Sequence, residues 1–505
     1  MVETQKSLRL STLRRGLLLP LAWTLLGAAD PAPVLKAREA WYDFKFYGNK
    51  VGHLHAKDSP TTINGRPAFV VHRASSVTVR RQEDVVRMES TTDAYFTPDG
   101  QPMKFNHTRL EGREQRTVTG YRDGDVLVIR SDVGGNIQEK RLPMKGASSN
   151  QGPCPGHLYL ASSLEVLFYN ALPAKQPLSG CAVDEAEGEI SAFSMKQVGM
   201  DGANFVVEET LGPLVSKAIV SKDGTMERTE MVGIGAEFVR TTQEDALRLD
   251  ATVDIFSSAL FSLPRPLPPG HTLDGLVVRI GSKSGKTPTF LTDARQSGKV
   301  VGTAVELRLV NARAPKKAQA RPIKDAKVKV FLKETPYEPI KDERLVAVVE
   351  RVLGSEKDAW TSAKAINRFV HDHIKKKTLA RAFATASEAL ETREGDCTEH
   401  SVLFSALAKI AGIPTRLATG LVYVGGANPV FGYHEWVEVY VGGDWIAMDP
   451  TFGQDLADST HLKFAVGQSD ADGLREAGMV AAAMIGDLDL KVLEYNTSSG
   501  DRIRF

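Results

Sequence analysis

"REGDCTEHSVLFSALAKIAGIPTR", from Arg393 to Arg416, is the stretch from which we infer the fold of the C-terminal part of this 505-residue chain. Asp396 followed three residues later by Glu399 is a variant of the capping box, which predicts that a helix begins at Cys397. A glycine and a proline then end the helix near its predicted C-terminus. Apolar residues at helical spacing predict its buried face, namely Val402, Leu403, Ala406, Leu407 and Ile410.

Cys397 is therefore predicted at the first position of a helix. Free backbone N–H groups and the positive end of the helix dipole face this position, which favours the thiolate over the thiol. The same N–H groups are suited to binding an oxyanion. The alternative for this segment alone is a small, buried cysteine without chemistry.

A second stretch, "FGYHEWVEVYVGGDWIAMDPTFGQ", carries a strong hairpin signal at Gly442–Gly443. If these two residues form the loop, Val441 pairs with Asp444. His434 and Asp449 then become diagonal neighbours on one face, close enough for the carboxylate to orient the imidazole. A three-residue loop without a bulge would reverse this parity and separate the two side chains.

The three residue types together predict nucleophilic catalysis by Cys397, His434 and Asp449. The histidine accepts the thiol proton, and the aspartate fixes its tautomer. No cofactor and no metal are expected. His371 and His373 diverge on a helix, so they do not suit zinc. The sequence also lacks a calcium loop of EF-hand type.

These stretches resemble the transglutaminase-like superfamily, and "DPTFGQDLADSTHLKF" resembles its bacterial exported branch. The resemblance covers roughly Pro336 to Gln468. It implies a papain-like fold in which the cysteine opens a core helix while histidine and aspartate lie on adjacent strands. It also implies acyl-thioester chemistry. Thr398 stands where animal cross-linking enzymes carry tryptophan, which weakens an assignment of glutamine–lysine cross-linking.

The predicted fold class is α+β, with antiparallel β-rich domains ahead of the transglutaminase-like core. Alternating segments broken by Asp-Gly pairs predict a barrel or half-barrel over residues 38–255. Residues 256–334 are expected to form a linker and a small β segment that includes "VVGTAVELRLV" and "AKVKVFL". The catalytic domain is placed at residues 335–480 and a C-terminal extension at 481–505.

The N-terminal residues 1–29 have a basic start and then the apolar run "GLLLPLAWTLLGAA", which is typical of a signal peptide. A retained anchor or a buried helix is the alternative to cleavage. We expect an exported protein, periplasmic or extracellular, without a stable membrane span in the mature chain. An oxidising compartment favours a Cys154–Cys181 disulfide over two buried free thiols.

The leading functional hypothesis is an exported cysteine enzyme that forms an acyl-thioester from a peptide or amide carbonyl and passes it to water or an amine. The alternative is a non-catalytic envelope-binding protein that uses its β domains and keeps the papain-like module as a scaffold. The expected partner is a peptide or protein substrate, with a cell-envelope component as one option. A formal net charge of +1 argues against nucleic acid. Lysines in "HIKKK" are expected at a solvated helix end.

Overall fold

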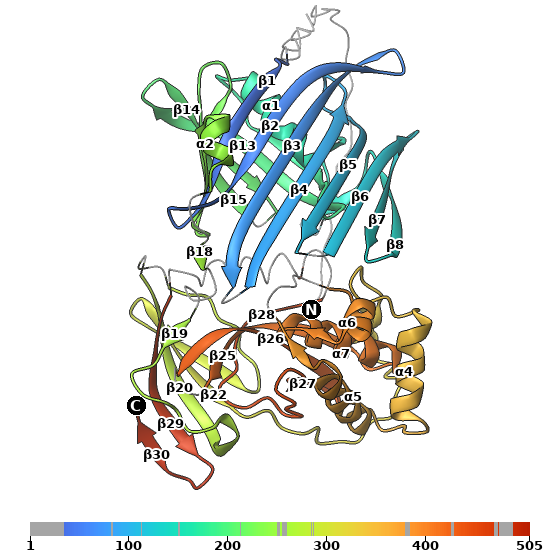
Figure 1. The fold of residues 1–505 in the computed structure, drawn as a ribbon, viewed down its shortest axis with the longest axis vertical. Helices are drawn as coiled ribbons and strands as arrows, with labels where there is room; N and C mark the ends of the chain where they lie inside the picture. Colours follow the sequence, from blue (N-terminus) through green and yellow to red (C-terminus); the bar gives the residue numbers. More distant parts are fainter. Residues whose placement is uncertain are drawn as a thin grey trace, which may run out of the picture.

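The computed structural model describes residues 35–81, 84–112, 114–149, 152–212, 214–249, 253–254, 260–283, 285, 287–378, 384–425, 429–468, 473 and 488–505. The predicted signal segment lies outside these residues. Figure 1 shows a large curved β-sheet above a helical unit and a smaller β-sheet that lie side by side. In the part of the chain that the structure describes, no helix is long and apolar enough to cross a membrane.

The large sheet is antiparallel over nearly all of its 16 strands, and its path runs from β11 to β8 with β1 beside β17. β11 and β8 pair with no further named strand among the described residues, but an isolated antiparallel bridge between Lys145 and His157 joins the segments next to these two ends. We refer to this sheet as the half-barrel. Its strands are β1 (Arg38–Phe46), β2 (Asn49–Ile63), β3 (Arg66–Arg81), β4 (Asp84–Phe96), β5 (Pro102–Glu111), β6 (Glu114–Asp123), β7 (Val126–Val133), β8 (Asn136–Pro143), β11 (Leu158–Leu160), β12 (Leu178–Asp184), β13 (Glu189–Asp201), β14 (Asn204–Leu211), β15 (Leu214–Val220), β16 (Met226–Met231), β17 (Ala236–Thr241) and β18 (Val253–Asp254).

Helix α1 (Ala161–Asn170) packs Leu164 and Phe168 against strand residues such as Phe193 and forms a core of the half-barrel. The predicted disulfide between Cys154 and Cys181 is present, with a Cα–Cα distance of 5.5 Å. It is part of a second apolar cluster under the same sheet. Three short elements complete this region: β9 (Ser148–Ser149), β10 (Gly152–Pro153) and α2 (Gln243–Leu247).

The small sheet joins two segments that the sequence placed in different units. β20 (Leu273–Ser282) lies between β22 (Ala304–Val310) and β29 (Leu488–Thr497), with β21 (Gln296–Val301) and β30 (Arg502–Arg504) at the edges. The C-terminal residues therefore complete the sheet begun by the small β segment. Because Val278, Leu307 and Val492 share one apolar cluster, this pairing is secured by a common core.

The segment "AKVKVFL" is not the strand that its alternation predicted. It forms the 3₁₀-helix η2 (Ala326–Leu332), which begins where the Asp325 side chain accepts a hydrogen bond from the N–H of Lys327. Val328 is buried while Val330 is 42% exposed, so the alternating valines do not share a buried sheet face. A local cap thus outweighs β propensity here.

The helical unit packs its helices on a five-stranded sheet (Figure 1). Leu345, Ala363 and Leu403 from three helices share one core with Val437 of the sheet. The helices are α4 (Glu343–Leu353), α5 (Ala359–His373), α6 (Ala386–Thr392) and α7 (Cys397–Ile410), and the sheet strands are β19 (Phe261–Ser262), β25 (Thr415–Val424), β26 (Val430–Val441), β27 (Asp444–Met448) and β28 (Leu462–Gly467). Remaining short elements are η1 (Gly270–Thr272), β23 (Lys376–Lys377) and β24 (Glu394–Gly395).

Candidate active site

Helix α7 begins at Cys397, as the sequence predicts. The carboxylate of Asp396 accepts hydrogen bonds from the N–H groups of Thr398 and Glu399, and the Glu399 carboxylate accepts one from the N–H of Asp396 at 2.9 Å. The capping box is therefore complete. These bonds occupy the N–H groups of Thr398 and Glu399, which are two of the first-turn donors expected to bind an oxyanion. Almost the whole helix is buried beyond its first turn, not only the predicted face.

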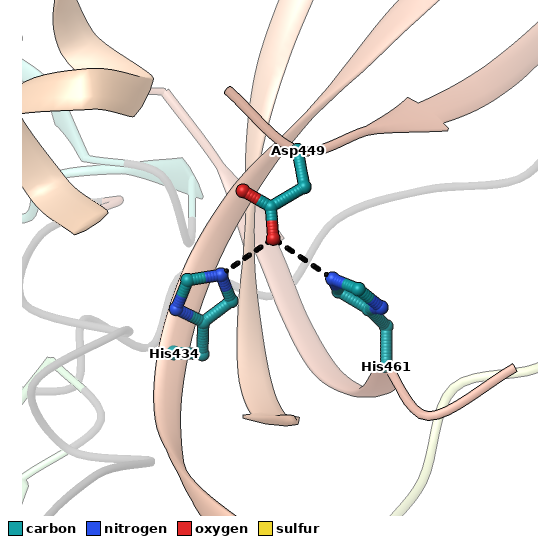
Figure 2. A group of neighbouring side chains, drawn as sticks. All are labelled: His434, Asp449 and His461. Carbon is teal, nitrogen blue, oxygen red and sulfur yellow. Dashed lines mark hydrogen bonds and ion pairs between the residues drawn. The ribbon is translucent and has the colours of Figure 1, made fainter. Parts of the chain in front are cut away.

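The hairpin register also follows the prediction. Val441 pairs with Asp444, so Gly442–Gly443 form a two-residue loop between β26 and β27. Nε2 of His434 lies 2.8 Å from Oδ2 of Asp449, and both side chains are buried. Because an ionised carboxylate only accepts hydrogen bonds, Nε2 carries the proton, and Nδ1 is left with its lone pair. Figure 2 shows this second ring nitrogen pointing away from Asp449.

The thiol of Cys397 is the only free thiol of the chain's three cysteines, and it is partly exposed. It lies next to the main chain of Glu435, the neighbour of His434, since the Glu435 backbone acts on its ionisation. No hydrogen bond among the described residues joins the thiol to the imidazole ring. Catalytic hydrogen bonds are often long before substrate binds.

The surroundings of the thiol oppose the predicted preference for thiolate. Burial raises the pKa of Cys397 well above its ordinary value, and the charges of Asp396 and Glu435 add to this effect. Burial also raises the pKa of Glu435 well above the usual range, helped by Asp396 and Glu399. One of the buried carboxyl oxygens of Glu435 has no hydrogen-bond partner among the described residues. The shift at Cys397 favours a resting thiol.

A lysine that the sequence assigned to a solvated helix end lies in this site. Helix α5 ends at His373, and Nζ of Lys377 lies 2.6 Å from Nε2 of the buried His400. Nδ1 of His400 donates to the carbonyl of Asp396, so Nε2 is the acceptor for the lysine. Burial lowers the pKa of Lys377, while Asp449, Cys397 and Asp396 oppose that shift. The positive charge of Lys377 thus interacts with both the Cys397 thiol and the Asp449 carboxylate.

His461, for which the sequence analysis named no role, is a second partner of Asp449. Its Nε2 lies 3.0 Å from the same Oδ2 that faces His434 (Figure 2). These three side chains are the one group of possible metal ligands among the described residues. Neighbouring ligand atoms of a tetrahedral zinc lie about 3.3 Å apart. The 2.8 and 3.0 Å contacts are shorter and fit hydrogen bonds. His371 and His373 bond separate backbone carbonyls.

A mostly apolar cavity of about 390 Å³ is connected to the site through one of its wall residues. Phe452 lines it and stacks on His434 with ring centroids 5.0 Å apart, and 43% of Phe452 stays exposed. Leu267 and Val424 form other parts of the wall, and Asp458 contributes a polar group. Periodicity gave no sign of this cavity because its walls come from three separate segments.

One family of known proteins is similar to the region that holds Cys397, His434 and Asp449. Residues 346–450 match the model of the transglutaminase-like superfamily. Among curated proteins none matches significantly. Three solved structures show low overall similarity to this chain. A candidate cysteine protease from Cytophaga hutchinsonii is 16% identical, with a TM-score of 0.28, over 46% of this chain and 90% of that one. A β-barrel-like protein of a domain of unknown function from Brucella abortus is 9% identical (TM-score 0.28; 41% of this chain and 97% of that one), and a candidate protease from Parabacteroides distasonis is 10% identical (TM-score 0.18; 78% of this chain and 68% of that one).

Proposed function

The chain carries a transglutaminase-like core, and on this premise we propose that the protein is a cysteine acyl-transfer enzyme. The observation that carries the proposal is the buried His434–Asp449 hydrogen bond of 2.8 Å beside the helix that Cys397 opens. A carboxylate in this position fixes the tautomer that leaves Nδ1 free to accept a proton, which is the requirement for activating a thiol.

The proposed reaction starts with transfer of the Cys397 proton to Nδ1 of His434 as the sulfur attacks a carboxamide or peptide carbonyl. The carbon–nitrogen bond then breaks, and the imidazolium returns the proton to the leaving amine. The product is a thioester on Cys397. Water or an amine attacks this thioester, His434 again carries the proton, and the free thiol is restored. The N–H of Cys397 is the first-turn donor that remains for the oxyanion, and the charge of Lys377 stabilises the developing thiolate.

We propose that the cavity beside Phe452 receives an apolar side chain of the substrate. Its wall residue Phe452 stacks on the ring that protonates the leaving amine, so we place its occupant on the leaving-group side of the scissile bond. A mostly apolar wall with a few polar groups is typical of binding pockets. Export to an oxidising compartment remains part of the proposal, and the Cys154–Cys181 disulfide supports it.

The test combines a thiol label with a turnover assay. Iodoacetamide should give a single adduct at Cys397, because the other two cysteines are paired. Fluorescein-labelled casein should be cleaved, or should incorporate a fluorescent primary amine, in a Cys397-dependent reaction. We expect Cys397→Ala and His434→Ala to lower turnover by about a thousandfold or more.

The two rivals give different results in the same assay. Amine incorporation identifies a transamidase, whereas cleavage alone identifies a peptidase or amidase. The non-catalytic binding protein predicts no thioester on Cys397 and no Cys397-dependent turnover. Full turnover by Cys397→Ala would refute the mechanism. His373→Gln is a matched control, since that imidazole bonds the carbonyl of Leu390 outside the site.

A further inference from the structure

His461 occupies an unusual position between two carboxylates. It lies directly before β28 and is fully buried. Its Nε2 lies 3.0 Å from Oδ2 of Asp449. Its Nδ1 lies 3.2 Å from Oδ1 of Asp458 and 3.3 Å from the backbone carbonyl of Asp458. Both ring nitrogens therefore face oxygen atoms.

Asp449 has no proton to offer to this contact. Its Oδ1 accepts hydrogen bonds from the N–H groups of Thr451 at 2.7 Å and Phe452 at 3.1 Å. Its Oδ2 faces both histidines (Figure 2). Burial would raise the pKa of Asp449, but His434 and His461 hold it well below its ordinary value. Asp449 is an ionised acceptor on every side.

The same holds for Asp458. Its Oδ1 accepts from the N–H and hydroxyl of Thr460 at 2.9 and 2.6 Å, and its Oδ2 accepts from Nε2 of Gln454 at 2.8 Å. Hydrogen bonds to His461 and Thr460 overcome the effect of burial and hold the pKa of Asp458 below its usual range. An imidazole whose two nitrogens both face acceptors must donate from both, which only the protonated ring can do.

We infer that His461 is held as an imidazolium between Asp449 and Asp458, and that its charge limits how strongly Asp449 acts on His434. His461 is then a positioning residue: it fixes the Asp449 carboxylate and offsets part of its charge without touching substrate. The protonation of His461 is argued from the hydrogen-bond geometry around its ring. The effect on His434 deepens the proposed function and rests on it for the role of His434.

The charged groups around this cluster are consistent with the assignment. The His434 ring lies 5.9 Å from the His461 ring. Lys377 and His400 act on Asp449 from the other side. Arg295 donates to the backbone carbonyls of Asp458 at 2.8 Å and His461 at 3.3 Å. Trp436 packs on His461 with ring centroids 5.2 Å apart and keeps water away. Burial would lower the pKa of His461, but Asp449 and Asp458 raise it.

Removing the positive charge should strengthen the pull of Asp449 on His434. Glutamine at position 461 places an amide N–H near the position of Nε2, so the donor to Asp449 is kept while the charge is lost. We expect the titration midpoint of His434 to rise by about one pH unit in His461→Gln. Asp458→Asn keeps an acceptor for Nδ1 but removes the charge that holds the second proton, so a smaller rise is expected.

The protonation state is tested by ¹⁵N NMR of protein labelled at histidine, with the His461 signals identified by their loss in His461→Gln. We expect two protonated ring nitrogens at His461 throughout pH 5.5 to 8. An unprotonated ring nitrogen of His461 at pH 7 would overturn the inference. This readout needs no catalysis, so it remains informative even if Cys397 proves to be an ordinary thiol.

The influence on His434 is measured by the same NMR titration in a Cys397→Ala background, which separates it from the thiol. A rise of the His434 midpoint in His461→Gln or Asp458→Asn supports the inference, and His373→Gln should leave it unchanged. An unchanged midpoint in a variant that keeps its circular dichroism spectrum would contradict it. If His461→Gln fails to fold, the inference is tested by the His434 midpoint in Asp458→Asn and by the ¹⁵N signals in the wild-type titration. In active enzyme, the acidic limb of kcat/KM should move upward with the His434 midpoint, because the proposed reaction starts from the neutral imidazole.

Discussion

At the scale of single residues, the site is defined by which side chains share hydrogen bonds and which do not. Asp449 is saturated by four donors, whereas the thiol of Cys397 is buried near the acidic groups of Asp396 and Glu435, and only Lys377 and the Glu435 backbone oppose their effect. The helix start alone suggested a thiolate. The full environment favours a resting thiol, because burial disfavours the charged form more than one helix end favours it. Deprotonation therefore depends on His434.

Phe452 provides a residue-scale test of the cavity. Its ring covers His434 and lines the wall, so Phe452→Ala should lower kcat and raise KM, with kcat/KM reduced about 10- to 100-fold. Val424→Ala is the matched control. This residue is similarly exposed and lines the same cavity without stacking on His434, so only KM should rise. Kinetics on the labelled casein measure both constants. Equal effects of the two variants on kcat would argue against the assigned cavity.

At the scale of elements, the β26–β27 hairpin positions the two residues that we propose as catalytic partners of Cys397. Its two-residue loop sets the register in which Val437 faces Met448, and this register places His434 and Asp449 on one face. A slip by one residue would turn one of the two side chains to the opposite face of the sheet. The hairpin is one of the features that the sequence predicts well, because turn type follows from the loop residues.

The loop glycines allow a matched test of this element. Both have positive φ, +70° at Gly442 and +95° at Gly443. An added Cβ at Gly442 would lie 3.0 Å from the carbonyl oxygen of Lys317, whereas nothing lies within 4 Å at Gly443. Gly443→Ala should cost about 1 kcal/mol of stability from backbone strain, and Gly442→Ala should cost more. Urea unfolding compares them, and equal losses would count against the close approach of Lys317.

At the scale of the whole molecule, contacts between distant segments position the core. The side-chain amide of Asn136 donates to the carbonyls of Thr335 and Pro336 at 3.2 and 2.8 Å, which ties the half-barrel to the chain that leads into α4. Thr378 donates to Asp84 at 3.3 Å near the active site. The half-barrel therefore contacts the helical unit at more than one point.

Buried acids spread over both units give the molecule a predicted pH dependence of stability. Burial raises the pKa of Glu185 and Glu209 to about 7 and that of Glu399 to about 8. The folded state therefore binds more protons than the unfolded state above the ordinary range of these groups, so stability falls as pH rises. Burial lowers the pKa of His107 and His400 to about 4. Those histidines give the opposite slope only below about pH 6.5.

Between pH 6.5 and 8 the acids should dominate. We expect each to contribute a loss of at most about 1.4 kcal/mol per pH unit while it stays protonated only in the folded state. Urea unfolding at several pH values measures the slope. Glu209→Gln should make the slope shallower, while the exposed Glu139→Gln, on the same sheet, serves as the control. A stability that stays constant or rises over this interval would show that these acids are ionised in the folded protein.

The local features of the site can be predicted from short stretches of the sequence. The helix start at Cys397, the register of the hairpin and the pairing of His434 with Asp449 follow from capping residues, a Gly-Gly loop and alternation over short distances. These signals work because they concern groups that the local backbone conformation brings together.

The surroundings of these residues depend on tertiary contacts between segments far apart in the chain. These contacts bring His461 and Lys377 to the site, line the cavity with Phe452, and pair the C-terminal strand β29 with β20. The strand prediction for "AKVKVFL" failed for the same reason, since burial of a side chain depends on what packs against it. The thiol's ionisation likewise depends on burial and on charges from other segments, and no periodicity along the chain records which distant segments will meet.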